Sequence, residues 1–234
     1  MSTPTSAPDA ARPFVLISGA VSVDGYIDDI SDDRLILSNP ADLDRVDQLR
    51  AESDAIMVGA GTIRIDNPKI VVSDPQRRTA RISQGRSEHP LKVTITTSGD
   101  LDTESKWFHT GGDRLIYTTT TTAQTLEGLV AGMAEVVSVG NQIDLKHLLA
   151  DLAERGVKQL MVEGGETLTT ALLVAGLVDE IQLAIAPLIV GGGPRWTDPA
   201  PLPWPASQRM ELIHAHTLDD MVILRYRSNP QTSP

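Results

Sequence analysis

The stretch Val157-Lys-Gln-Leu-Met-Val-Glu-Gly-Gly-Glu-Thr-Leu168 decides the fold, because a strand should end and a helix should begin within it. Residues 157–162 predict a strand, and the helix that opens after the two glycines should end at Gly176. The free N–H groups and the positive dipole end of such a helix can hold an anion, and glycine lets a phosphate approach the backbone. Packing alone also explains a strand-to-helix turn with two glycines, so the two interpretations remain alternatives.

The same alternation of strand and helix extends outward from this turn in both directions. Asn39-Pro40-Ala41-Asp42 predicts a helix start, with asparagine as the cap and proline at the first helical position. Helices are also predicted at 122–131 and 144–155, and strands at 14–23, 55–58, 91–96, 114–117, 135–139, 179–188, 208–216 and 221–226. Strands separated by helices predict an α/β fold with a mostly parallel central sheet, and the last two strands predict an antiparallel C-terminal hairpin at one edge.

Two stretches are predicted to be irregular. Residues 73–90 are polar and rich in arginine, and residues 191–206 carry five of the 15 prolines. Long loops of this kind in compact domains tend to be functional or disordered. Polar residues at both ends predict tails at 1–12 and 228–234, which leaves a single domain over residues 13–227.

Composition excludes several classes of function. The 234 residues include 20 Lys and Arg against 31 Asp and Glu, a net charge of −11, and no cysteine. The missing cysteines exclude a disulfide framework, a thiolate metal site and a cysteine nucleophile. The acidity argues against nucleic acid or an anionic membrane as partner. No apolar run reaches the length of a membrane span and no signal peptide is evident, so we expect a cytoplasmic protein.

The charge is unevenly distributed along the chain. Residues 24–54 hold ten acids and three arginines, a sum of −7, whereas residues 64–92 hold seven basic residues and three acids, a sum of +4. A positive segment in an acidic protein indicates a phosphate-bearing small molecule. A solvated loop with ordinary surface arginines is the alternative. Arg50 ends the first predicted helix, where the helix dipole already favours a cation.

Two carboxylates stand beside strand ends and glycines, and these are the candidate catalytic groups. Glu163 should lie beyond the carboxyl end of its strand, where ligands bind in open α/β sheets. Asp24, in Ser22-Val-Asp-Gly25, has either a catalytic role or the role of a turn residue. The five histidines show no metal-ligand spacing, so no metal site is predicted. Gly59-Ala60-Gly61-Thr62 is a second turn of the strand-to-helix kind, and Gly191-Gly192-Gly193 a flexible connection or one with positive φ.

The ordered set of motifs resembles the pyrimidine reductase family of riboflavin biosynthesis. Ser22-Val-Asp-Gly25, Gly61-Thr62, Asp66-Asn67-Pro68, Val162-Glu-Gly-Gly165 and Gly176-Leu-Val-Asp-Glu180 carry this resemblance, together with Ala186-Pro187 and Gly191-Gly192. It implies a three-layer fold like that of dihydrofolate reductase, a homodimer, and NADPH-dependent reduction. The substrate implied is a phosphoribosylaminopyrimidine, either the aminouracil or the diaminopyrimidinone, which would be reduced to its ribitylamino product.

The resemblance also assigns roles to individual residues. It implies NADPH contacts at Thr62 and Asp66, a 2′-phosphate contact at Ser98, and a pyrophosphate-binding turn made of Gly164, Gly165, Glu166, Thr167 and Leu168. It implies substrate contacts at Glu163 and Arg50, and further ones at Asp33 and Ile70.

The sequence departs from the family at Ser18, where many bacterial members have a lysine, and at Ser73, where they have an arginine. Arg77, Arg78 or Arg81 are the alternative holders of the substrate phosphate. The H-x-E and C-x-x-C motifs of the bacterial zinc deaminase are absent, so the reductase would act before or after a separate deaminase. Two other functions stay open: a dihydrofolate-type or other pteridine reductase of the same fold, and a non-catalytic nucleotide-binding homologue.

Overall fold

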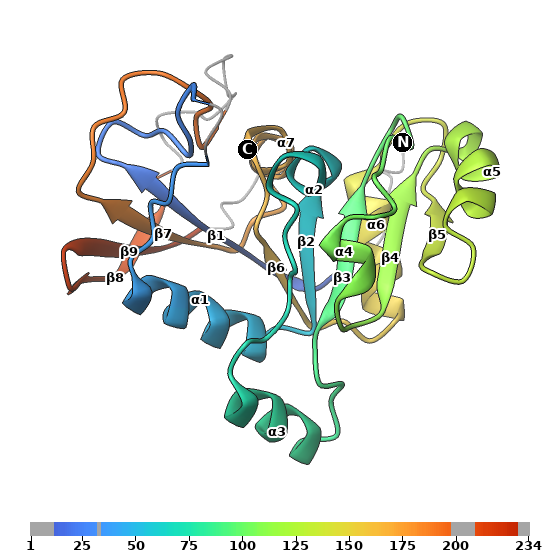
Figure 1. Cartoon of the computed structure of the whole chain (residues 1–234), viewed down its shortest axis with the longest axis horizontal. Coiled ribbons are helices and arrows are strands. Elements are labelled where there is room, and N and C mark those ends of the chain that lie inside the picture. Colours follow the sequence, from blue (N-terminus) through green and yellow to red (C-terminus); the bar gives the residue numbers. More distant parts are fainter. Residues whose placement is uncertain (1–11, 32–33, 198–208, 229–234) are drawn as a thin grey trace, which may run out of the picture.

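A nine-stranded sheet forms the centre of the molecule (Figure 1), with the strand order β5-β4-β3-β2-β6-β1-β7-β9-β8. The computed structural model describes residues 12–31, 34–197 and 209–228. The strands are β1 (Phe14–Ser22), β2 (Ala55–Gly59), β3 (Leu91–Ile95), β4 (Arg114–Thr118), β5 (Glu135–Ser138), β6 (Gln159–Val162), β7 (Glu180–Ala186), β8 (Glu211–Leu218) and β9 (Met221–Arg227). All pairs from β5 to β7 are parallel, and β9 pairs antiparallel with β7 and β8. The mostly parallel sheet and the antiparallel C-terminal hairpin are therefore confirmed.

Seven helices occur in the described part of the chain: α1 (Pro40–Glu52), α2 (Ala60–Asp66), α3 (Pro75–Ser83), α4 (Lys106–His109), α5 (Thr120–Leu129), α6 (Leu145–Glu154) and α7 (Glu166–Val174). Asn39 caps α1 by accepting a hydrogen bond from the Asp42 N–H, as predicted from the Asn-Pro pair. Asp144 caps α6 in the same way through the N–H groups of Lys146 and His147.

The helices cover both faces of the sheet, which gives three layers. On one face, apolar side chains of β1, β2 and β6 such as Ile17 and Met57 pack against α6 and α7. On the other face, Leu16, Ile56 and Met161 pack with side chains of α1, α2, α4 and α5. Both faces of the central strands are therefore buried, as expected of a parallel sheet.

The prediction of an irregular loop at 73–90 is wrong for half of that stretch, because α3 lies within it. Asp74 caps α3 through the N–H groups of Gln76 and Arg77, and Pro75 takes the first helical position. The short helix α4 was also not predicted. Of the stretch 191–206, residues 198–206 lie outside the described residues.

The structure describes two residues of the predicted tails, Arg12 and Ser228. Arg12, placed in the first tail by the sequence, pairs with Asp179 through two hydrogen bonds of 2.6 and 2.8 Å. The Ser228 N–H donates to the Asp179 carbonyl. The rest of both predicted tails, residues 1–11 and 229–234, lies outside the described residues. Among the described residues, no helix is long and apolar enough to cross a membrane.

Candidate active site

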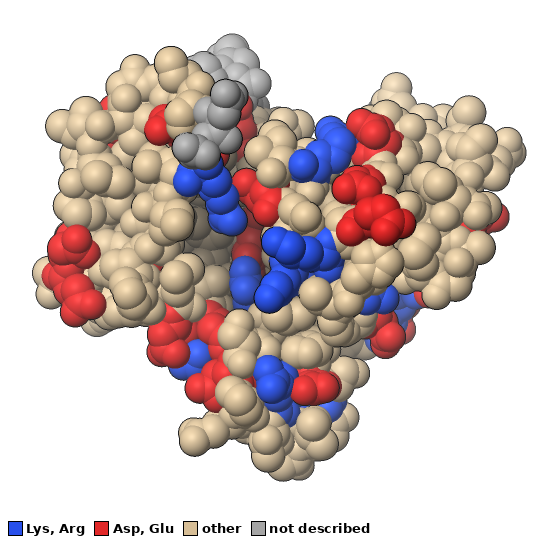
Figure 2. All heavy atoms as spheres, in the orientation of Figure 1, with Lys and Arg blue, Asp and Glu red and all other residues tan. Residues whose placement is uncertain are grey.

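A cavity of about 980 Å³ opens at the carboxyl ends of the central strands. Its lining comes from the ends of β1, β2, β3 and β6, from α1 and α2, and from the first turn of α7. Ligands bind at this end of open α/β sheets, because the strand-to-helix turns meet there. Figure 2 shows a cleft in the middle of one face of the molecule, with basic side chains along it and acidic ones close by.

Glu163 and Arg50 form a two-pronged ion pair in this cavity. The Arg50 Nε and Nη2 atoms each donate to one carboxylate oxygen of Glu163 at 2.6 Å. The pair is mostly buried, with 22% of the Arg50 side chain and 15% of the Glu163 side chain exposed. Burial alone would lower the pKa of Arg50, but the Glu163 charge and hydrogen bonds outweigh it and raise that pKa. The helix dipole is therefore not the main partner of Arg50.

Strand pairing fixes the place of Glu163. It follows the last residue of β6, and its N–H donates to the Met57 carbonyl of β2 at 2.9 Å. The carboxylate thus leaves the sheet where the glycine turn begins. Arg50 reaches it from the last turn of α1, 113 residues away in the sequence.

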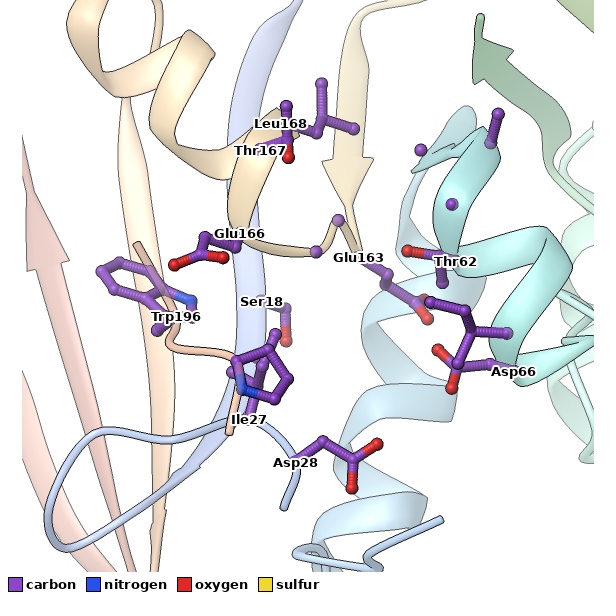
Figure 3. A pocket seen from close by; sticks show the side chains of 18 of the residues that line it. Ser18, Ile27, Asp28, Thr62, Asp66, Glu163, Glu166, Thr167, Leu168 and Trp196 are labelled. Carbon is purple, nitrogen blue, oxygen red and sulfur yellow. The ribbon is translucent and has the colours of Figure 1, made fainter. Parts of the chain in front are cut away.

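The glycine turn and the start of α7 form another wall. All five predicted residues, Gly164 to Leu168, line the cavity. A Cβ atom at Gly164 would lie 3.0 Å from the Leu168 side chain, so close packing gives this glycine a structural reason too. Gly165 is the N-cap of α7 and has no side chain to satisfy the first helical N–H groups. Figure 3 shows Glu166 pointing toward Trp196, away from Thr62.

Thr62 and Asp66 line the cavity from α2, across from α7 (Figure 3). A Cβ atom at Gly165 would lie 3.4 Å from the Thr62 hydroxyl, so the two helix starts face each other closely. Burial raises the pKa of Asp66, and the Asp28 charge adds to this effect while Arg34 opposes it. Ser98 also lines the cavity, from the turn after β3.

Asp24 lies outside the cavity lining, so the predicted catalytic role lacks a geometric basis. Its carboxylate accepts hydrogen bonds from the Ser22 hydroxyl at 2.6 Å and from the N–H groups of Val190 and Gly191 at 3.1 and 2.8 Å. The Ser22 hydrogen bond, with those of the two backbone groups, lowers the pKa of Asp24 to about 2. The turn interpretation fits this geometry, because Asp24 ties the loop after β7 to the end of β1.

Ile70 likewise lies outside the cavity lining. Its side chain is 3% exposed and packs in the core beneath α2 and α4. Its φ of 48° is unusual for a β-branched residue. Asp33, the other predicted substrate contact, lies outside the described residues.

Arg77, Arg78 and Arg81 of the positive segment make contacts that hold α3 in place, and none of these three lines the cavity. Arg77 pairs with Asp44 and Asp47 at 2.8 and 2.9 Å, and Arg78 pairs with Glu88. Arg81 donates to the carbonyls of Ala51 and Ser53 at the end of α1. Figure 1 shows α3 at the far end of the sheet from α2 and α7. The position of these three arginines outside the cavity lining therefore does not support the prediction that they hold a substrate phosphate.

Several cavity residues were not predicted from the sequence. Among them are Asp28, Arg34, Arg64 and Trp196, and Ser18 was noted only as a departure. Ser18 is 6% exposed, and its hydroxyl has no hydrogen-bond partner among the described residues. Only Arg64 carried a usable signal, since it lies two residues after the Gly61-Thr62 turn. Within 12–31, 34–197 and 209–228, no group of three or more His, Asp or Glu could hold a metal.

Comparison with known proteins gives consistent matches. The RibD C-terminal domain family matches residues 13–224. The 2,5-diamino-6-ribosylamino-4(3H)-pyrimidinone 5′-phosphate reductase of Archaeoglobus fulgidus is 37% identical over 77% of this chain and 83% of its own length. The protein of the same name from Methanothermobacter thermautotrophicus is 32% identical over 92% and 98%. The solved structure of Acinetobacter baumannii RibD superposes with a TM-score of 0.76 at 24% identity over 93% of this chain, which spans 58% of that one.

Proposed function

The chain belongs to the RibD C-terminal domain family, and we propose that it is a pyrimidine reductase of riboflavin biosynthesis. The observation that carries this proposal is the cavity, where the Glu163–Arg50 pair lies beside a glycine turn that can hold an anion. A reductase needs to hold two reactants side by side, and the cavity has the volume of a large ligand site.

The substrate we propose is 2,5-diamino-6-ribosylamino-4(3H)-pyrimidinone 5′-phosphate, in preference to the aminouracil. Three relatives that are 32–37% identical to this chain carry that compound in their names. The pyrimidine has an edge of N–H and carbonyl groups. Glu163 would accept hydrogen bonds from the N–H groups, and Arg50 would donate to the carbonyl.

Arg34 is the residue that we assign to the substrate phosphate. Its side chain is 66% exposed and lies 3.7 Å from Asp66, so the guanidinium is less neutralised than that of Arg50. It also lines the cavity, unlike the arginines of α3. A guanidinium can donate two parallel hydrogen bonds to a phosphate.

The cofactor that we propose is NADPH, which supplies the hydride when it is bound. Residues of the chain fit such a cofactor: the uncapped start of α7 offers N–H groups to a pyrophosphate, and Gly164 and Gly165 keep the approach open. Thr62 faces Gly165 and has a hydroxyl to donate. Thr62 and the start of α7 would orient the two bound ligands and reduce the access of water to them.

The proposal is tested by measuring oxidation of NADPH with the pyrimidinone phosphate, with the aminouracil phosphate and with dihydrofolate. We expect turnover that depends on a phosphoribosylaminopyrimidine. Turnover with dihydrofolate alone would favour the pteridine reductase, and binding without any turnover would favour the non-catalytic homologue.

We further propose that the chain acts in the cytoplasm as a homodimer, with residues 13–227 as one domain. The exposed edge strand β8 supports pairing with a second copy, because its outer backbone groups have no neighbouring strand in the described sheet. Light scattering should give about twice the chain mass of 25.2 kDa. A mass that stays at one chain across the micromolar range would overturn the dimer.

A further inference from the structure

Two loops that are far apart in the sequence lie against each other at one side of the cavity. We call them the loop pair: residues 23–31 follow β1, and residues 188–197 follow β7. Figure 1 shows them together beyond the ends of these two strands. The Ile27 N–H donates to the Pro194 carbonyl at 3.0 Å, so the two backbones are joined directly.

An antiparallel β-bridge decides which side chains of the loop pair face the cavity. Tyr26 pairs with Arg195 in this bridge. Neighbouring residues of an extended chain point to opposite sides. Tyr26 and Arg195 accordingly lie outside the cavity lining. Their neighbours Ile27, Pro194 and Trp196 belong to the lining. The bridge therefore separates an outer contact from an inner wall.

The outer contact joins a guanidinium to a phenol. The Arg195 Nη2 atom donates to the Tyr26 hydroxyl at 2.9 Å, and the guanidinium carbon lies 4.4 Å from the centre of the Tyr26 ring. A cation in this position is attracted to the face of an aromatic ring. The Nη1 atom of Arg195 donates to the Asp24 carbonyl at 3.5 Å. Arg195 thus contacts the other loop through both ends of its guanidinium.

The inner wall is made by the half-buried indole of Trp196. The indole lies against β1, where a Cβ atom at Gly19 would be 3.2 Å from the Trp196 Nε1 atom. The missing side chain at Gly19 therefore makes room for the ring. Figure 3 shows Trp196 on the side of the cavity opposite Thr62, with Glu166 next to it.

The loop pair also fixes how close the two backbones come. Gly193 has a φ of +127°, and a Cβ atom there would overlap the Asp28 carbonyl oxygen. Only glycine fits this place. One side of the Trp196 indole packs against the apolar cluster that includes side chains of β1 and α7, and another side borders the cavity. The position of the indole therefore depends on the loop that carries it.

We propose that Tyr26 and Arg195 are positioning residues: their contact holds the Trp196 indole in place as a wall of the cavity and so slows the release of a bound ligand. A side chain that is ordered before binding loses less entropy when a ligand packs against it. An aromatic ring offers a large apolar face for such packing. The effect on a ligand rests on the proposed function, and NADPH is the probe for it.

The alternative role of the outer contact is only to stabilise the fold. That role predicts that a variant of Arg195 unfolds more easily, while Trp196 behaves like the other tryptophans. The chain has three tryptophans, so fluorine NMR of a chain labelled with fluorinated tryptophan can observe each of them. The resonance that disappears in Trp196→Phe is that of Trp196.

The first measurement compares spectra of the wild type, Arg195→Gln, Arg195→Lys and Arg78→Gln without ligand. Arg78 pairs with Glu88 outside the cavity, so Arg78→Gln is a matched loss of a guanidinium. In Arg195→Gln we expect the Trp196 resonance to move toward its position in the chain unfolded in urea. The resonance of the fully buried Trp107 should stay in place. Arg195→Lys keeps a cation over the phenol ring and should reverse part of the shift.

Gly19→Ala moves the same indole by a different route. The new methyl group would press on the Trp196 ring while the Tyr26–Arg195 contact stays intact. The Trp196 resonance should therefore shift in this variant as well.

The second measurement is the rate of NADPH release by stopped-flow fluorescence. We expect release from Arg195→Gln to be about tenfold faster than from the wild type and Arg78→Gln, which corresponds to about 1.4 kcal/mol. Tyr26→Phe keeps the ring but loses the hydroxyl, so its release rate should lie between the two.

An unmoved Trp196 resonance in Arg195→Gln would overturn the positioning role, and so would an equal shift of the Trp107 resonance. Release at the wild-type rate would overturn the effect on the ligand. If NADPH does not bind the wild type, the proposed cofactor fails, whereas the spectra without ligand still decide whether Arg195 holds Trp196.

Discussion

At the scale of the residue, the proposed function depends on a carboxylate and a guanidinium that neutralise each other. The Glu163–Arg50 pair holds both groups in a fixed plane before any ligand arrives, since each oxygen has its own donor at 2.6 Å. Such preorganisation reduces the entropy that is lost when a substrate binds. The pair also leaves the remaining lone pairs of Glu163 to face the cavity.

Replacing Glu163 with glutamine tests this pair. We expect Glu163→Gln to lower kcat/KM by about 100-fold, which corresponds to about 2.7 kcal/mol of transition-state stabilisation, because the amide cannot accept from both Arg50 and the pyrimidine. The Kd for NADPH should change by less than about threefold. Steady-state kinetics and fluorescence titration measure the two quantities.

Glu166→Gln is the matched control, since it makes the same chemical change three residues later at the start of α7. It should leave the pair intact and tighten NADPH, because an acid is removed beside the proposed pyrophosphate site. If Glu163→Gln weakened NADPH as much as it slowed turnover, Glu163 would not be a substrate contact.

A second residue of interest is Lys92, which is fully buried in β3 away from the cavity. Its Nζ atom donates to the Trp107 carbonyl and to the carbonyl and hydroxyl of Thr110 at 2.7–3.2 Å, and none of these acceptors is charged. Burial, with the nearby charges of Arg114 and Arg50, lowers the pKa of Lys92 to about 7.

This pKa predicts how stability changes with pH. Between pH 7 and about 10 the unfolded chain holds the Lys92 proton and the folded chain does not, so this residue makes unfolding less favourable as the pH rises. The free energy of unfolding of the wild type should therefore rise relative to that of Lys92→Met as the pH increases over this range. Urea denaturation at several pH values measures it, and a constant difference would contradict the lowered pKa.

The sequence predicted several residues that line the cavity, but it did not predict which side chains these residues contact. Glycines and a carboxylate after a strand mark the place of a site, because strand ends converge there. Asp24 shows the limit of this argument: it also follows a strand, but its side chain turns to the loop at 190–191. Which arginine meets which carboxylate depends on contacts between distant segments, and no local pattern contains them.

At the scale of the element, α3 explains both a wrong prediction and a structural role. Its only buried residue is Arg81, so it has no apolar stripe that a periodicity argument could detect. The capping pair Asp74-Pro75 was the available signal. Arg77 and Arg81 of α3 bind α1 and its C-cap Ser53, and α1 carries Arg50 into the cavity.

Removing the Arg81 contacts should loosen α1. Arg81→Met keeps the side-chain stem but leaves the buried carbonyls of Ala51 and Ser53 with fewer donors, and we expect a loss of about 2–3 kcal/mol of stability. Chemical denaturation measures this loss. Gln76→Ala, on the exposed face of α3, is the control and should stay within about 0.5 kcal/mol. Equal stability of both variants would show that Arg81 does not anchor α1.

At the scale of the whole molecule, alternating patterns predicted the class of the fold but not its strand order. The sheet places β1 between β6 and β7, and β2 between β3 and β6, so neighbours in space are often distant in sequence. The prediction of a parallel sheet rested on helices between strands, which is a local feature. The order, the two layers of helices and the depth of the cavity arise from packing among all of these elements.

The proposed function requires that this cavity holds a pyrimidine phosphate while hydride from NADPH reduces its ribosyl side chain. The most direct measurement is the mass of the product formed from the diaminopyrimidinone phosphate with NADPH that carries deuterium at the hydride position. We predict a ribitylamino product with two more hydrogens than the substrate, one of them deuterium on the side chain. Unchanged substrate, or deuterium in the pyrimidine ring, would rule out this reaction.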